Sequence, residues 1–184
     1  MPDLAGEKPF YSGYTGGIDS AGAARIAASL NAARNDGFDS IHLAFSSHGG
    51  NVADGIFLYN HLRALNIPLH IYNTGSVSSI AVAVFLGADH RYCSKHGMFM
   101  IHPTSFFQLP ECSTDRLRTL YEAALADDER TNSILRERTR LPDNFLDARR
   151  LSDVHITPDM ALEHEVVHAL TEFSVPKGIQ VFQI

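Results

Sequence analysis

Apolar positions along the chain follow two spacings, one typical of helices and one typical of strands. Residues 20–35 carry apolar side chains at i, i+3, i+4 and i+7, namely Ala23, Ile26, Ala27 and Leu30. Strand and helix then alternate along the chain, as they do in right-handed βαβ units, and the predicted fold class is α/β. The pattern predicts strands at 9–13, 40–46, 69–73, 91–94, 97–102 and 181–182, and helices at about 20–35, 52–65, 77–87, 114–139, 143–149 and 157–170.

Two of the predicted helices differ from an ordinary amphipathic helix. The segment 77–87 is apolar nearly all round, which predicts a buried helix. The segment 114–139 has an apolar face in its first half and is strongly charged in its second half. We expect this long helix to project from the domain and to meet another subunit.

Composition places the chain among ordinary globular proteins. It has 184 residues, 45% of them hydrophobic and 20% charged, which suits a single domain over residues 1–184. The net charge of −6 gives no electrostatic reason to expect nucleic acid or an anionic membrane as a partner. The two cysteines, Cys93 and Cys112, are expected to stay reduced, and no apolar targeting core opens the chain, so we expect a cytoplasmic protein.

Ser79 and His102 are the pair that points to chemistry. Ser79 lies in a turn of small residues that precedes the buried helix, and His102 ends an apolar strand before Pro103. A serine needs a base within hydrogen-bond reach to become a nucleophile, and a histidine serves that purpose most often. Upstream, the turn Ser47-His48-Gly49-Gly50 has backbone amides that can face the same point. Taken singly, Ser79 is better interpreted as a helix cap, since capping serines are common, and His102 is weak evidence as one of ten histidines.

The order of these segments resembles the proteolytic subunit of the Clp protease (the ClpP-like family). The resemblance extends from about Phe10 to Val167 and includes the glycine turn, a serine four residues after Gly75, and the segment Met100-Ile101-His102. It implies that Ser79 is the nucleophile, that His102 is the base, and that the backbone amides of Gly50 and Ile80 form the oxyanion hole. His48 departs from the family pattern, which has proline there.

The resemblance also implies a catalytic triad whose third member is an aspartate, and the sequence marks the position of that residue less clearly. The family's aspartate lies a few residues before a helix start that reads Ile156-Thr157-Pro158-Asp159 here. Strict spacing selects Ser152, whereas a shift of one residue selects Asp153. We take Asp153 as the predicted third member, and Asp147 is the next alternative.

The resemblance further implies a ClpP/crotonase-like domain of repeated ββα units with the projecting helix at about 114–139. The implied activity is that of a serine endopeptidase that hydrolyses peptides or unfolded proteins without a cofactor, within a homo-oligomeric ring and with an ATP-dependent unfoldase as a partner. A catalytically impaired or scaffold subunit of the same fold is the alternative. The acyl-CoA enzymes of the crotonase branch rank last, because they do not require Ser79 and His102 in this order.

One motif favours a different enzyme class. His164-Glu165-Val166-Val167-His168 matches HExxH, which on a helix places two histidines on one face to bind zinc, with the glutamate as general base. A third ligand is hard to find, since Glu172 is the only later acidic residue. We therefore treat a zinc-dependent hydrolase as a lesser alternative.

Overall fold

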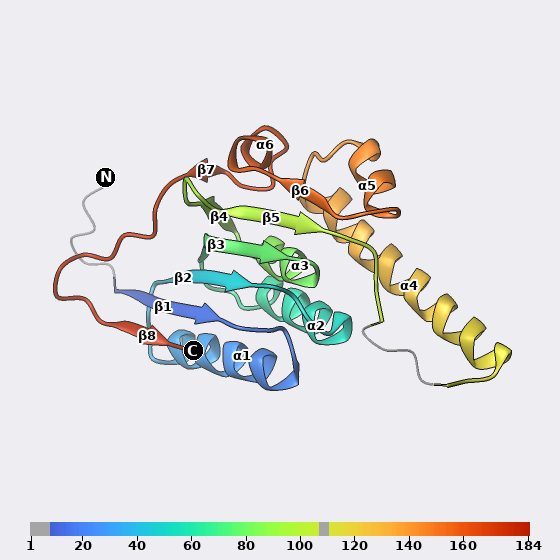
Figure 1. The fold of residues 1–184 in the computed structure, drawn as a ribbon. Helices are drawn as coiled ribbons and strands as arrows, with labels where there is room; N and C mark the ends of the chain where they lie inside the picture. The colour runs from blue at the N-terminus through green and yellow to red at the C-terminus, as the bar shows by residue number, and fades with distance from the viewer. Residues whose placement is uncertain (1–7, 107–110) are drawn as a thin grey trace.

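A mostly parallel sheet forms the centre of the fold in the computed structural model, which describes residues 8–106 and 111–184 (Figure 1). The strands lie in the order β6-β5-β3-β2-β1-β8, and β4 pairs with both β3 and β7. The β5–β6 pair is antiparallel, and the other described pairs are parallel. The strands are β1 (Pro9–Thr15), β2 (Ser40–Ser47), β3 (Leu69–Ser78), β4 (His90–Cys93), β5 (Met98–Ile101), β6 (Val154–Ile156), β7 (Ala169–Leu170) and β8 (Val181–Gln183).

Helices α1, α2 and α3 lie side by side along one face of this sheet (Figure 1). The first of them begins where Asp19 accepts a hydrogen bond from the amide of Gly22 at 2.7 Å, which satisfies one of the free amides of its first turn. The mixed α/β class predicted from the alternating pattern is confirmed. The helices are α1 (Ser20–Asn35), α2 (Val52–Arg63), α3 (Ile80–Leu86), α4 (Thr114–Arg138), α5 (Asp143–Arg149) and α6 (Pro158–Glu163).

The core lies between the sheet and these helices, with α3 at its centre. All seven residues of α3 are buried, as its uniformly apolar sequence predicts. Gly55 lets α2 approach closely, because a Cβ at this position would lie 2.2 Å from Cγ1 of Ile80. The helix that begins beside Ser79 is therefore held firmly by its packing.

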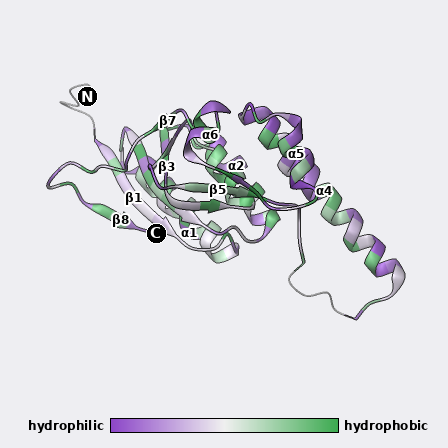
Figure 2. Ribbon diagram, turned by 45° about the horizontal axis from the view of Figure 1, so that its top comes forward, coloured by the Kyte–Doolittle hydropathy of each residue, from purple (hydrophilic) through white to green (hydrophobic). Residues whose placement is uncertain are grey.

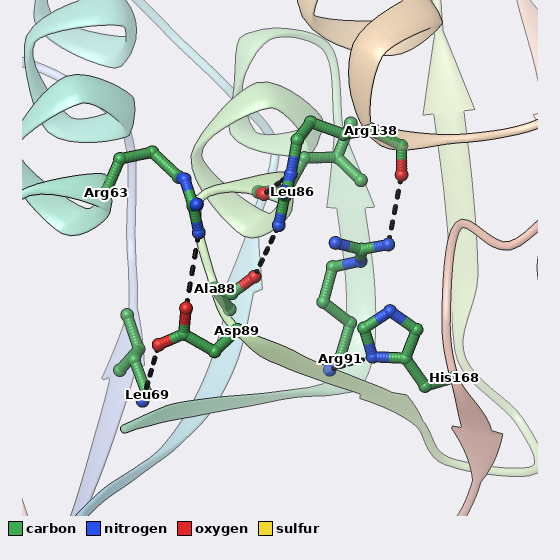
Figure 3. Close-up of polar contacts among 8 residues, drawn as sticks. All are labelled: Arg63, Leu69, Leu86, Ala88, Asp89, Arg91, Arg138 and His168. Carbon is green, nitrogen blue, oxygen red and sulfur yellow. Dashed lines mark hydrogen bonds and ion pairs between the residues drawn. The ribbon is translucent and has the colours of Figure 1, made fainter. Parts of the chain in front are cut away.

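Two arginines, Arg138 and Arg91, bind backbone carbonyl groups close to the end of α3 (Figure 3). Arg138 donates to the carbonyl oxygens of Leu86 at 3.1 Å and Ala88 at 3.0 Å. Arg91, which is 3% exposed, donates to the carbonyl of Val166 at 2.9 Å and to that of Arg138 at 3.0 Å. Burial lowers the pKa of Arg91 to about 10. These contacts join α4 to the C-terminal end of α3.

The opposite face of the sheet carries a row of rings. Tyr11, His42, His70 and His90 are register partners on four adjacent strands. Their ring centroids lie 4.8, 4.4 and 4.4 Å apart in that order, and the rings are stacked. Cross-strand stacking of this kind stabilises a sheet, whereas protonation of neighbouring histidines would place like charges opposite each other and weaken it.

Helix α4 occupies two environments. Its second half packs against α3 and buries Thr131, Asn132, Ile134 and Leu135. Its first half extends away from the sheet (Figures 1 and 2) and leaves the side chains of Leu117, Tyr121 and Leu125 between 48% and 62% exposed. Over residues 8–106 and 111–184, no helix has both the length and the apolar character needed to cross a bilayer.

The prediction of a helix at 157–170 is wrong beyond residue 163. The helix α6 ends at Glu163, and Glu165 adopts a φ of 54°, which turns the chain away from the helical path. The chain then forms the short strand β7 beside β4. The strand β6, which lies beside the segment that carries His102, was not predicted.

Candidate functional site

Ser79 lies at the junction of β3 and α3 in a backbone conformation that L residues rarely adopt. Its φ is 59° and its ψ is −135°, and its side chain makes no capping hydrogen bond to α3. Its amide donates to the carbonyl of Met100 on β5 at 2.7 Å. Ser79 therefore occupies the N-cap position of α3, but its hydroxyl does not cap the helix. Strained strand-to-helix turns of this type expose a nucleophilic hydroxyl in other hydrolases.

The turn after β2, which contains Gly49 and Gly50, packs directly against Ser79. Gly49 has a φ of 94°, and a Cβ on it would lie 2.6 Å from the Cβ of Ser79. Gly50 forms a parallel bridge with Ile18, through the bonds Ile18 N–H to Gly49 O (2.8 Å) and Asn51 N–H to Ile18 O (2.7 Å). The bridge uses the groups on either side of Gly50, which leaves the N–H of Gly50 free of it.

His102 follows β5 directly and lines the same site as Ser79. It is half-buried, and together with Ser79, Gly50 and Ile80 it lines a pocket of about 60 Å³. The pocket thus gathers the predicted nucleophile, the predicted base and both predicted oxyanion donors. Three separate segments supply them: the turn after β2, the β3–α3 junction and the end of β5.

Asp153 does not line this pocket, and its side chain is exposed. The antiparallel register of β5 and β6 pairs Ile101 with Val154, so continuing it by one residue sets His102 opposite Asp153. Ser152 then falls opposite Pro103. Among the ion pairs of the described residues, none includes Asp153 or Asp147.

The pocket also contains polar residues that the sequence did not point to. Arg149 of α5 lines it with a side chain that is 4% exposed, and its Nη2 pairs with Oδ1 of Asp128 at 3.1 Å. Its Nη1 donates to Oδ1 of Asn132 at 2.8 Å, while its buried Nε has no partner among the described residues. Burial lowers the pKa of Arg149, opposed by Asp128. Thr104, two residues after His102, lines the same pocket.

The HExxH segment does not have the helical geometry that a zinc site requires. The helix ends before it, so His164 and His168 do not share a helix face. Glu165 pairs with Arg140 at 2.8 Å, and Nδ1 of His168 accepts the amide of Arg91 at 3.2 Å. In the part of the chain that the structure describes, no group of three or more candidate ligands is arranged to hold a metal ion.

A family model, curated relatives and a solved structure all indicate similarity to the same kind of protein. A family model described as Clp protease matches residues 13–172. The ATP-dependent Clp protease proteolytic subunit of Paracoccus denitrificans is 28% identical over 144 residues, which cover 77% of this chain and 71% of that protein. The proteolytic subunit 2 of Pseudomonas aeruginosa is 23% identical over 159 residues, which cover 85% and 78%. Among solved structures, a point mutant of ClpP1 from Listeria monocytogenes superposes with a TM-score of 0.75 at 18% identity, and 91% of each chain is covered.

Proposed function

Because this chain belongs to the Clp protease family, we propose that it is a serine endopeptidase in which Ser79 is the nucleophile and His102 its base. The observation that carries the proposal is the pocket of about 60 Å³ on which Gly50, Ser79, Ile80 and His102 converge. The strained backbone of Ser79 supports it further, because such strain persists where the surrounding structure enforces it for function.

In the proposed reaction the hydroxyl of Ser79 attacks the scissile carbonyl carbon of a peptide. His102 takes the hydroxyl proton and returns it to the leaving amine, and a water then releases the acyl group by the same steps. The amides of Gly50 and Ile80 donate to the oxyanion that forms. The loss of one such donor costs about 3–4 kcal/mol in known hydrolases.

Asp153 is the proposed third member of the triad. Side chains directly opposite each other on antiparallel strands lie on the same face, and the β5–β6 register, if continued by one residue beyond Ile101 and Val154, would set Asp153 opposite His102. This argument favours Asp153 over Ser152 and Asp147. A carboxylate there orients the imidazole and stabilises the imidazolium that forms during attack.

We also propose that the chain forms a homo-oligomeric ring and degrades peptides or unfolded proteins. The exposed apolar side chains on the first half of α4 support a contact between subunits. By analogy with the two relatives named as ATP-dependent subunits, an unfoldase is the proposed partner for folded substrates.

A serine-directed fluorophosphonate probe tests the proposed chemistry. We expect stoichiometric labelling of Ser79 in the assembled protein, and loss of both labelling and peptide hydrolysis in Ser79→Ala. Ser78→Ala is the matched control, since Ser78 is the preceding serine, at the end of β3, and does not line the pocket. An assembled, folded protein that is not labelled and does not hydrolyse peptides would instead be a scaffold subunit.

A further inference from the structure

Asp128 on α4 is bonded to the segment that follows His102. Its Oδ1 accepts the amide of Thr104 at 2.7 Å and the hydroxyl of Thr104 at 3.0 Å. The same oxygen pairs with Nη2 of Arg149 at 3.1 Å. An ionised carboxylate can accept several hydrogen bonds at once, and those to a charged acceptor are about twice as strong as neutral ones.

The environment of this carboxylate favours a fixed geometry. The side chain of Asp128 is 17% exposed and that of Arg149 is 4% exposed. Arg149 is held in turn by Asn132, one helical turn further along α4. A buried ion pair that is satisfied on several sides holds its members in one arrangement. Three elements therefore meet at one oxygen atom: the loop that follows β5, the helix α4 and the helix α5.

We infer that Asp128 is a positioning residue of the Ser79–His102 site. Thr104 is only two residues from His102, and both line the same pocket. By binding both polar hydrogens of Thr104, Asp128 fixes the chain just after the base and so limits where the imidazole can lie. This role rests on the proposed peptidase function, and it assigns to a residue of the long helix a part in aligning the base.

Asp128→Asn is the variant that tests the inference, because it keeps the shape of the side chain and removes its charge. We expect the maximal rate of Ser79 labelling by the fluorophosphonate to fall by roughly 10- to 100-fold, as small misplacements of catalytic groups do. The probe concentration at half-maximal rate should change little, since the groups that bind the probe remain. Asp127→Asn is the matched control, with the same charge change one residue away on an exposed ion pair to Arg130.

A second measurement does not depend on catalysis. Hydrogen–deuterium exchange of the peptide that covers residues 99–106 should speed up in Asp128→Asn and stay unchanged in Asp127→Asn. If the single variant does not fold because the charge of Arg149 is left unmatched, the double variant Asp128→Asn/Arg149→Gln removes both charges and should show the same two effects.

The outcomes separate the inference from the proposed function. Wild-type labelling at Ser79 with unchanged rate and exchange in Asp128→Asn would overturn the inference and leave the peptidase proposal standing. Absence of wild-type labelling would overturn the peptidase proposal. In that case, unchanged exchange in Asp128→Asn would also reject the positioning of the 102–105 segment, and faster exchange would support it.

Discussion

Gly49 packs directly against Ser79, and a Cβ on Gly49 would lie 2.6 Å from the Cβ of Ser79 and 2.8 Å from the carbonyl oxygen of Ser78. The glycine turn and the serine turn thus determine each other's position. Any side chain at residue 49 has to displace the backbone that presents the Ser79 hydroxyl.

Gly49→Ala should lower stability and abolish labelling of Ser79. The left-handed φ of 94° costs an alanine about 1–3 kcal/mol, and the clash with Ser79 adds to that cost. Gly37→Ala is the control, because Gly37 has a φ of 73° but nothing within 4 Å of an added Cβ. Thermal unfolding and probe labelling of both variants check the prediction. Equal effects of the two substitutions on stability and labelling would contradict it.

Asp153→Asn should lower kcat for peptide hydrolysis by on the order of 10⁴-fold, with a small change in KM, as removal of the orienting carboxylate does in serine proteases. Ser152→Ala and Asp147→Asn should leave kcat within about two-fold, because neither residue is brought opposite His102 by the β5–β6 register. Steady-state kinetics on the three variants decides the third triad member. A large loss in Asp147→Asn with none in Asp153→Asn would reverse the assignment.

The histidine row should make the protein sensitive to acid. Burial, and secondarily neighbouring histidines, lower the pKa of both His42 and His70 to about 4. The unfolded chain binds these protons near pH 6.5, so it holds more protons than the native chain between pH 6.5 and 4. Stability therefore falls as the pH is lowered through that window.

His70→Phe keeps a ring in the stack and removes one of the two titrating imidazoles. The free energy of unfolding should therefore fall less steeply between pH 6.5 and 4. Denaturant unfolding at a series of pH values measures the slope. His96→Phe, which alters an exposed histidine outside the stack, should leave the slope unchanged. An identical slope in His70→Phe and wild type would refute this account.

Arg138→Met should destabilise the fold by about 2–4 kcal/mol, because the carbonyls of Leu86 and Ala88 each lose a charged donor. Arg136→Met should cost less than about 1 kcal/mol, since Arg136 pairs with Glu129 in an exposed ion pair at 3.4 Å. Urea unfolding of the two variants compares a half-buried donor with a surface donor on the same helix. Similar losses in both would show that the contacts at the end of α3 contribute little.

Tyr121→Lys should reduce assembly without unfolding the protomer. Tyr121 is 62% exposed on the projecting half of α4, and Leu117 and Leu125 lie one turn away on each side. A charge in an apolar contact between subunits carries a desolvation cost. Ala123→Lys adds the same charge to an exposed position on another face of the helix and should assemble normally. Native mass spectrometry of both variants gives the oligomeric state.

Local sequence signals predicted most of the elements, and they failed where contacts in space decide the structure. Helix α5 was placed correctly at 143–149, since Pro142 and the charged residues around it mark its ends. Helix α6 was extended too far because the apolar spacing continues past Glu163, whereas the backbone reverses at Glu165. The strand β6 has only three residues, and pairing with β5 defines it more than its own composition does.

In the site, too, local sequence signals predicted some residues, and contacts in space determine the others. Ser79, His102 and the glycine turn belong to segments with a recognisable local form, and the structure brings them to one pocket. Asp128 and Arg149 were not predicted, because they lie in charged stretches that resemble a solvated helix surface. Their burial depends on Asn132 and Thr104, which reach them only in the folded chain.

The hydrogen bond from the amide of Ser79 to the carbonyl of Met100 has a consequence for the whole site. Met100 lies on β5 and His102 follows that strand directly, so β5 anchors both the serine turn and the histidine. Main-chain hydrogen bonds of the sheet therefore contribute to their spacing, in addition to the side-chain contact between Thr104 and Asp128. A shift of this strand would therefore move the serine turn and the histidine together.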